Sequence, residues 1–237
     1  MYRNILAILF LGLLTVKKVS TTFEERKLRQ YLFETSNYNK NIRPVTNYSR
    51  PVEVQQGIAV QTLESFDQIN EAISLNLWIR SSWKDEYLKW DDSPDLDLQE
   101  LDFLSVNKDE IWIPDTELLN AATKPDIYYL QGGINLYSDG SILYSKPGIF
   151  TSSCALNLRD FPFDSQNCTI LTGSWVYHDE LLHLMPYTDV NKQIDVLSSF
   201  SHSEWQVDHV EVRHLKETRD CCPDKEFDQL SYSFILN

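Results

Sequence analysis

The sequence predicts an all-β protein, either an antiparallel sandwich or a barrel. Apolar and polar residues alternate over several short runs, and residues that favour turns separate these runs. Many short strands joined by turns are typical of antiparallel architectures and not of a parallel α/β sheet. The alternating runs are residues 53–66, 72–83, 203–215 and 229–236.

One early segment, "FEERKLRQYLFETS", has the spacing of a short amphipathic helix. Its apolar residues fall among charged ones, so one side of the helix is expected to pack against the domain. These apolar residues are Leu28, Tyr31, Leu32 and Phe33.

Two β elements follow from local patterns. In residues 72–83 the alternation places one apolar set, Ile73, Leu75, Leu77 and Ile79, on a single face of a strand. Further on, Asp139-Gly140 separates two apolar runs, which is a strong short-range signal for a β-hairpin.

The segment of residues 94–115 is rich in acids and proline and is expected to be a loop leading to Trp112. Trp83 and Trp112 are expected to be packing residues, because large aromatic side chains supply much of a buried core.

The composition is that of a globular domain, with 42% hydrophobic and 24% charged residues in a chain of 237. The formal net charge of −14 disfavours a nucleic-acid partner, because phosphate binding needs a basic surface. An acidic surface instead attracts cations, including organic ammonium compounds. The same charge also has a simpler role in keeping a protein soluble.

The N-terminus has an early Arg3 and an apolar run, residues 5–14, that is too short to span a bilayer as a helix. The run fits the core of a signal peptide, so we expect residues 1–20 to be a signal peptide and residues 21–237 to form one domain. A buried N-terminal helix is the alternative. We expect a secreted protein, either soluble or the extracellular part of a longer one.

An oxidising compartment makes the four cysteines a disulfide framework with three possible connectivities. Two possible glycosylation sites, Asn47 and Asn167, agree with export. Zinc knuckles use Cys-x-x-Cys spacing, which these cysteines lack. The sequence predicts no cofactor and no metal site.

Several motifs together resemble the Cys-loop pentameric ligand-gated channels. "CALNLRDFPFDSQNC" resembles that family's signature loop, and "NKNIRPV", "WKDEYLKW", "IWIPD", "SDGSILY", "PGIF" and "GSW" occur in the family's order. The adjacent Cys221-Cys222 is similar to the nicotinic branch and to its soluble acetylcholine-binding relatives. The resemblance covers nearly the whole chain after the leader. The receptor-like "FPFDSQNC" loop favours a receptor ectodomain over a soluble relative.

The resemblance implies a helix capping an immunoglobulin-like sandwich of about ten strands. It also implies a ring of five subunits, which could all be identical. It also implies the disulfide pairs Cys154–Cys168 and Cys221–Cys222, the second stiffening a loop tip. It further implies a small neurotransmitter-like amine bound between subunits, in a box of aromatic side chains that offer their π faces to a cation.

The resemblance assigns residues to both sides of that box. The principal face would hold Trp175 and the cysteine pair, with Phe227 if one extra residue is allowed after the cysteines. The complementary face would hold Trp78, with Tyr137, Leu143 and Ser145 from the hairpin.

Three positions depart from the cholinergic pattern. Leu119 and Arg219 stand where the family has tyrosines, and a cationic Arg219 should repel an ammonium ligand unless it points away or pairs with an acid. Arg80 resembles an arginine that holds the ligand carboxylate in glycine- and GABA-type receptors, a task that suits a guanidinium group. An amino-acid or other anion-bearing ligand, or an orphan pocket, is therefore the alternative. Both arginines are expected to be solvated surface charges.

A secreted enzyme is the third hypothesis. His178 lies beside Asp179 and Glu180, but no nucleophile elbow, zinc-protease motif or phosphate loop accompanies them. A solvated turn accounts for these residues, and the sequence predicts no enzyme.

Overall fold

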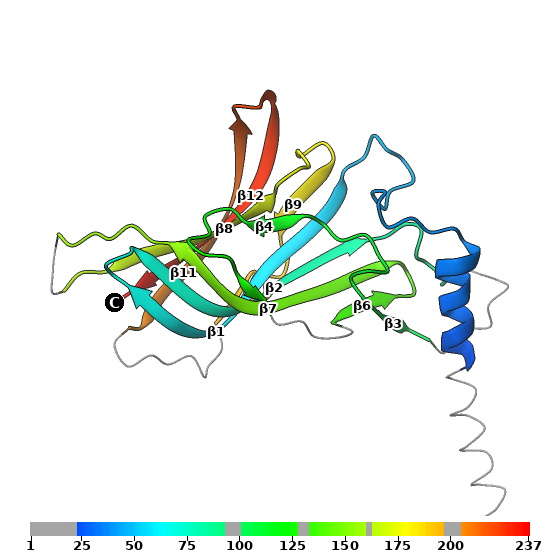
Figure 1. Ribbon diagram of the computed structural model, residues 1–237, viewed down its shortest axis with the longest axis horizontal. Coiled ribbons are helices and arrows are strands. Elements are labelled where there is room, and N and C mark those ends of the chain that lie inside the picture. The colour runs from blue at the N-terminus through cyan, green and yellow to red at the C-terminus, as the bar shows by residue number, and fades with distance from the viewer. Residues whose placement is uncertain (1–22, 93–100, 128–132, 160–162, 197–204) are drawn as a thin grey trace, which may run out of the picture.

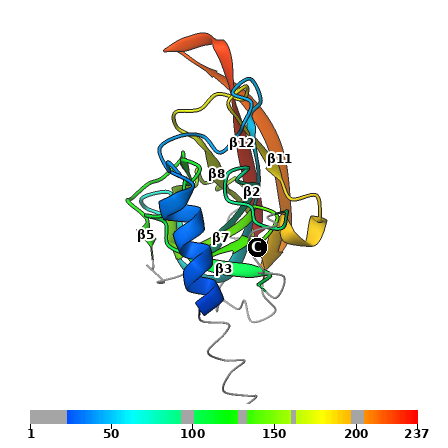
Figure 2. The ribbon, with the colours of Figure 1, turned by 90° about the vertical axis from the view of Figure 1, so that its right-hand side faces the viewer.

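The computed structural model describes residues 23–92, 101–127, 133–159, 163–196 and 205–237. Two β-sheets form a sandwich, and a helix crosses one end of it (Figures 1 and 2). The C-terminus lies toward the opposite end (Figure 1). The predicted all-β sandwich with an N-terminal helix is confirmed. The predicted signal peptide, residues 1–20, lies outside the described residues.

Within the described residues, the larger sheet has eight strands and the smaller sheet has four. The larger comprises β1 (Val52–Asp67), β2 (Ala72–Lys84), β3 (Phe103–Val106), β5 (Asp126–Ile127), β6 (Ile134–Tyr137), β7 (Ser141–Ser153), β9 (Leu182–Pro186) and β10 (Ile194–Val196). Its order is β10-β1-β2-β7-β6-β3, with β5 paired to β7 and β9 paired to β1. The smaller comprises β4 (Thr116–Leu118), β8 (Gln166–Ser174), β11 (Val207–Arg219) and β12 (Cys222–Leu236), in the order β11-β12-β8-β4.

Strand β2 confirms the predicted alternation. Ile73, Leu75, Leu77 and Ile79 are all buried, because they share the face that packs into the sandwich. Trp78, which lies between two of them, points to the other face of the sheet and is exposed. The alternation therefore fixes which side chains this strand presents outward.

The predicted hairpin joins β6 and β7. Gly140 adopts a φ of +85°, and its backbone N–H donates to the Tyr137 carbonyl at 2.9 Å. A positive φ favours glycine, because a Cβ atom is strained there. A Cβ on Gly140 would also lie 2.4 Å from the Asp85 backbone oxygen, so this turn requires glycine for two reasons.

The N-terminal helix is α-helical over residues 23–29 and continues as the π-helical segment η1 (Gln30–Thr35). Leu28 and Leu32 are fully buried, and Tyr31 and Phe33 pack against the same core. The predicted amphipathic helix is confirmed. Among the described residues, none of the helices combines the length and apolar character needed to cross a bilayer.

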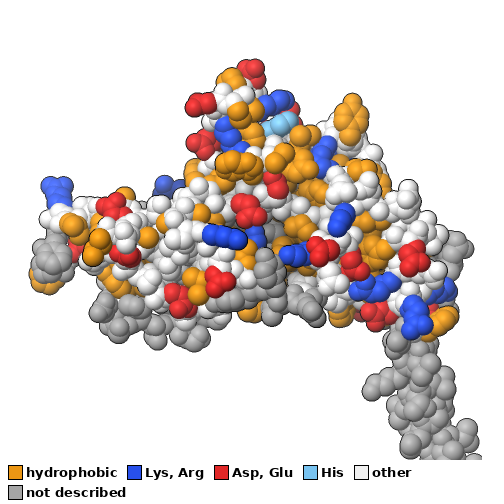
Figure 3. All heavy atoms as spheres, viewed as in Figure 1, with side chains coloured by type: hydrophobic (Ala, Val, Ile, Leu, Met, Phe, Trp, Pro, Cys, Tyr) orange, Lys and Arg blue, Asp and Glu red, His pale blue; other side chains and the backbone are white. Residues whose placement is uncertain are grey.

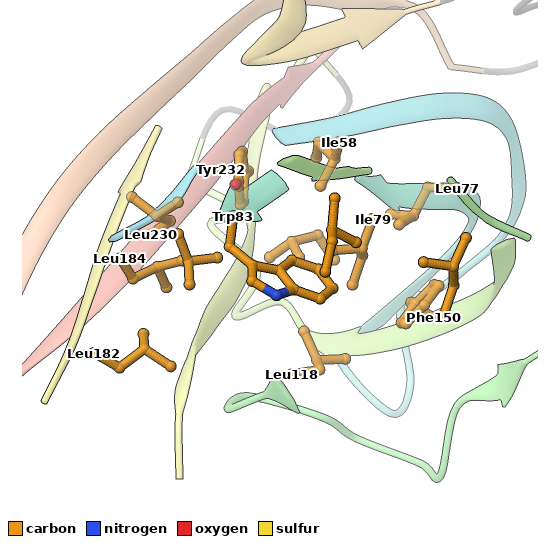
Figure 4. Close-up of a cluster of buried hydrophobic side chains, with 14 of the residues drawn as sticks. Ile58, Leu77, Ile79, Trp83, Leu118, Phe150, Leu182, Leu184, Leu230 and Tyr232 are labelled. Carbon is orange, nitrogen blue, oxygen red and sulfur yellow. The ribbon is translucent and has the colours of Figure 1, made fainter. Parts of the chain in front are cut away.

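The core lies between the two sheets and around Trp83 (Figure 4). Trp83 and Trp112 are both buried and meet edge to face, with ring centroids 6.2 Å apart. Both tryptophans are therefore packing residues, as predicted. The buried Gln56 side chain spans the sandwich, donating to Thr116 at 3.1 Å and accepting from Thr172 at 2.5 Å.

One segment differs from the expectation. The acidic stretch predicted to be a loop contains strand β3, which pairs with β6, so a loop assignment for all of residues 94–115 was wrong. The short 3-10 helix η2 (Val190–Lys192) precedes β10. Strands β11 and β12 form a long hairpin that projects from the sandwich (Figures 1 and 2).

A disulfide joins Cys154 to Cys168 and thereby links the two sheets. Cys154 follows β7 of the larger sheet, and Cys168 lies within β8 of the smaller one. Both sulfur-bearing side chains are buried. The bond therefore closes the "FPFDSQNC" loop at its base.

Candidate ligand-binding site

The predicted principal face centres on Trp175, which follows β8 and is 70% exposed. Asp115 holds this segment in place: one carboxylate oxygen accepts from the Ser174 hydroxyl at 2.6 Å, and the other accepts from the Val176 backbone N–H at 2.7 Å. Asp115 ends the "IWIPD" motif. The motif thus positions the tryptophan, a role that the sequence analysis did not assign.

Arg219 lies inside the cluster of principal-face residues. Its guanidinium carbon sits 3.8 Å from the centroid of the Phe227 ring and 5.6 Å from that of Trp175. It also donates hydrogen bonds to the Trp175 carbonyl at 2.6 Å and to the Ser174 carbonyl at 2.8 Å. The expectation of a solvated surface charge was therefore wrong for Arg219. Two ring faces and two carbonyls contact the guanidinium, although Arg219 stays partly exposed.

Phe227 is buried and lies against the Arg219 guanidinium. On its far side it meets His178, with ring centroids 6.4 Å apart and an interplanar angle of 87°. His178 therefore packs against the Phe227 ring, a contact that its acidic neighbours in the sequence do not indicate.

The two acidic residues after His178 form ion pairs with the β11–β12 hairpin. Lys216 donates to Asp179 at 2.5 Å, and Lys225 donates to Glu180 at 2.5 Å. The lysine in each pair holds the pKa of its carboxyl partner below the usual range. A simple solvated turn was therefore an incomplete description, because these pairs connect the turn to the hairpin.

Leu119 lies beneath the tryptophan segment. A Cβ added at Gly173 would lie 2.9 Å from the Leu119 Cδ1 atom, so Leu119 packs directly on the glycine that precedes Ser174. Leu119 thus gives the principal face an apolar contact where a tyrosine was expected.

The expected bond between Cys221 and Cys222 stays a prediction. Their sulfur atoms lie 2.7 Å apart, which is longer than the bond of about 2.05 Å in a disulfide but closer than two separate thiols pack. Cys221 lies in the turn between the two strands, and Cys222 begins strand β12. The pair forms the tip of the hairpin, where Figure 3 shows hydrophobic and charged side chains mixed.

The predicted complementary face is a single outward surface of the larger sheet. In the pairing of β2 with β7, Arg80 lies opposite Ser145, and Ser82 lies opposite Leu143. Directly paired residues share a face, as do alternate residues along a strand. Trp78, Arg80, Leu143 and Ser145 therefore point to the same side. Tyr137 joins them, because it lies two residues from Asn135, which pairs with Leu143.

Arg80 is only 23% exposed, so the expectation of a solvated charge was wrong here too. Its Nη1 atom lies 3.7 Å from Asp195, while its Nε and Nη2 atoms are buried without a hydrogen-bond partner. The Tyr187 hydroxyl is also buried and unpartnered, and burial raises its pKa against the opposing effect of Arg80. The Nε and Nη2 atoms of Arg80 can therefore still donate hydrogen bonds.

The two predicted faces lie on different sheets of one chain. Within the described residues, no recorded hydrogen bond, ion pair or ring contact joins Trp175 and its neighbours to Trp78 and its neighbours. The two predicted faces therefore lie apart within one chain. The predicted glycosylation residues Asn47 and Asn167 are both exposed.

A two-sheet sandwich with a capping helix, a disulfide-closed loop and a projecting cysteine-tipped hairpin defines an extracellular ligand-binding domain. The chain belongs to the family described as the neurotransmitter-gated ion-channel ligand binding domain, whose sequence profile matches residues 25–237. Members of this family bind ligands and are not enzymes, so the enzyme hypothesis is excluded.

Receptor subunits are among the similar proteins. The chain is 34% identical over 228 residues to neuronal acetylcholine receptor subunit alpha-6 of Mus musculus, covering 95% of this chain and 44% of that protein. It is 32% identical over 217 residues to subunit alpha-3 of Rattus norvegicus, covering 92% and 42%. It is 34% identical over 204 residues to the alpha-type subunit acr-16 of Caenorhabditis briggsae, covering 86% and 39%. The chain thus spans less than half the length of these relatives.

Proposed function

We propose that the chain binds a small organic amine, with acetylcholine as the reference ligand, between neighbouring subunits of a pentameric ring. The similar proteins are named as acetylcholine receptor subunits, and that naming supports the choice of reference ligand. The principal face would be Trp175, Phe227 and the cysteine-tipped hairpin. Trp78 of the next subunit would complete the box.

The observation that supports this proposal is the position of the Arg219 guanidinium, itself an organic cation. The Arg219 guanidinium lies against the rings of Phe227 and Trp175 and donates to two backbone carbonyls. A site that binds one organic cation with π faces and carbonyl oxygens has the chemistry to bind another. The ligand amine would enter by displacing Arg219, whose contacts in the described residues are to two backbone carbonyls and two aromatic rings.

A ring of identical chains would be sufficient for this site. Trp175 and Trp78 occur in the same chain, and both are exposed, at 70% and 41%. An exposed tryptophan on each of two faces suits burial at an interface between copies, since tryptophan is enriched at such contacts. We therefore propose a homopentamer. Mass measurement of the purified protein by light scattering tests this assembly, and a stable monomer at micromolar concentration contradicts it.

The ligand proposal is tested by titrating acetylcholine, nicotine and epibatidine into the assembled protein while tryptophan fluorescence and heat are recorded. We expect saturable binding that Trp175→Ala and Trp78→Ala each abolish. Tyr48→Ala is the matched control, because Tyr48 is an exposed aromatic residue outside both faces. If none of the three amines binds at millimolar concentration, the amine proposal fails.

A second candidate ligand carries a carboxylate. The buried, unpartnered Nε and Nη2 atoms of Arg80 favour it, because a guanidinium can grip a carboxylate with two hydrogen bonds. Glycine, GABA and glutamate are the probes. Arg80→Gln should abolish their binding and leave assembly intact, whereas Arg213→Gln, on an exposed part of β11, should change neither. Unchanged affinity in Arg80→Gln rejects this candidate.

A further inference from the structure

Three side chains of metal-ligand type meet at the base of the projecting hairpin. His183 comes from β9, His214 from β11 and Asp228 from β12. The Asp228 carboxylate lies 2.6 Å from His183 Nδ1 and 2.8 Å from His214 Nε2, one contact to each of its oxygens. Asp228 also accepts from the Leu184 backbone N–H at 3.1 Å.

The Asp228 carboxylate needs a compensating positive charge. Its side chain is only 1% exposed, and a buried carboxylate is costly unless it is paired. Lys216 lies directly across the strand pair from Asp228, but it is bound to Asp179 at 2.5 Å and to Glu226 at 3.1 Å. The two imidazole groups are therefore the partners that remain for this carboxylate in the described structure.

We propose that His183, His214 and Asp228 form a zinc-binding site. Two imidazole nitrogens and a carboxylate oxygen are ligands that Zn²⁺ prefers, and three protein ligands with a water in the fourth position make a familiar open site. The three ligand atoms all lie within 4.8 Å of one another. Tetrahedral zinc bonds of about 2.0–2.1 Å place ligand atoms about 3.3 Å apart.

Loading the site requires the three side chains to rearrange. The nitrogen–oxygen contacts of 2.6 and 2.8 Å, which involve different Asp228 oxygens, must lengthen by about half an ångström to admit the ion. Any ligand atoms that lie near the 4.8 Å limit must move closer together, toward about 3.3 Å. Any proton on the two ligand nitrogens passes to solvent, because an imidazole nitrogen binds metal through its lone pair. The histidine side chains are 34% and 31% exposed, so the ion has an entry path and its water ligand has space.

The site lies apart from the proposed amine box and does not depend on it. His214 and Asp228 belong to the two strands of the hairpin, and His183 belongs to β9 of the other sheet. Zinc would therefore fasten the hairpin to the body of the sandwich. The three residues are far apart in the sequence, so they form no local metal-binding motif.

Calorimetric titration of ZnCl₂ into the purified chain, prepared without a polyhistidine tag, tests this site. We expect one zinc ion per chain in the unmodified protein and at least a tenfold loss of affinity in both His183→Gln and His214→Gln. His209→Gln is the matched control, since His209 is an exposed histidine on the same strand as His214, and it should bind zinc as the unmodified protein does.

Unchanged zinc affinity in His214→Gln, or no stoichiometric zinc binding by the unmodified protein, overturns the proposal. A second measurement needs no variant that might misfold: Co²⁺ added to the unmodified chain should give the visible absorption bands of a tetrahedral site. Bands of an octahedral ion, or none, would also overturn it.

Discussion

Replacing Arg219 by glutamine should strengthen amine binding. In the structure this guanidinium occupies the space over Phe227 and Trp175 that an ammonium ligand needs. Any amine that enters must first remove it and then bear the repulsion of a nearby like charge. Glutamine is neutral and retains a donor for one of the two carbonyls that Arg219 now binds.

The two ring contacts set the size of the effect. A cation over an aromatic face at a partly exposed site is worth about 0.5–1 kcal/mol, so the two contacts together contribute about 1–2 kcal/mol. Because 1.4 kcal/mol corresponds to a factor of ten in affinity, removing the competing Arg219 contacts should tighten amine binding by about 5- to 30-fold. The hydrogen bonds are omitted because glutamine can replace part of them.

The assay is equilibrium binding of nicotine to the assembled protein, compared among three chains at one salt concentration. Arg213→Gln is the control, since Arg213 lies on the same strand but pairs with Glu211 at 2.8 Å, outside the box. It should bind as the unmodified protein does. Equal or weaker binding by Arg219→Gln, in a protein that remains folded and assembled, would refute the argument that Arg219 competes with the ligand.

Three further predictions concern stability. Replacing Cys154 and Cys168 together by serine should lower the free energy of unfolding by about 3 kcal/mol, because the bond closes a loop of about 15 residues; urea unfolding measures this, and no change contradicts it. Burial raises the pKa of Asp85 to about 6, above its unfolded value, so its contribution to stability is complete below pH about 4 and is lost as pH rises through 6. Relative to Asp85→Asn, the unmodified protein should thus lose up to roughly 3 kcal/mol between pH 4 and 7, and parallel stability curves for the two proteins would contradict this. Gly140→Ala should cost at least about 1–2 kcal/mol in the same assay, because alanine is strained at a φ of +85° and its Cβ meets the Asp85 backbone; an unchanged midpoint would show that the turn relaxes.

A strand can be predicted where one of its faces is buried, because apolar residues then recur at every second position of the sequence. Strand β2 is the clearest case, because one face enters the core and the other carries Trp78 and Arg80. Strand β3 was missed, since its four residues give too short an alternation to stand out from the acids around it.

The sequence predicts which residues form the candidate site, but it does not predict their geometry. The motifs around Trp175 and Trp78 identify the residues that each face presents. They do not indicate that Arg219 turns inward, because residue type alone favours water around a guanidinium. The inward position depends on two carbonyls and the Phe227 ring, which only the folded hairpin brings together.

The metal-ligand cluster was likewise beyond local sequence patterns. His183 and Asp228 meet only because β9 packs against the hairpin, and nothing near either residue in the chain signals that contact. The bond between Cys221 and Cys222 is a different case, because only the resemblance implies it, and with the two sulfur atoms 2.7 Å apart it stays a prediction.

A structure of the assembled protein with bound nicotine would test the central claim most directly. The account predicts the ligand nitrogen between Trp175 and Phe227 of one subunit and Trp78 of its neighbour, with Arg219 turned out of the box. Nicotine bound elsewhere, with the Arg219 guanidinium still over Phe227, would contradict it.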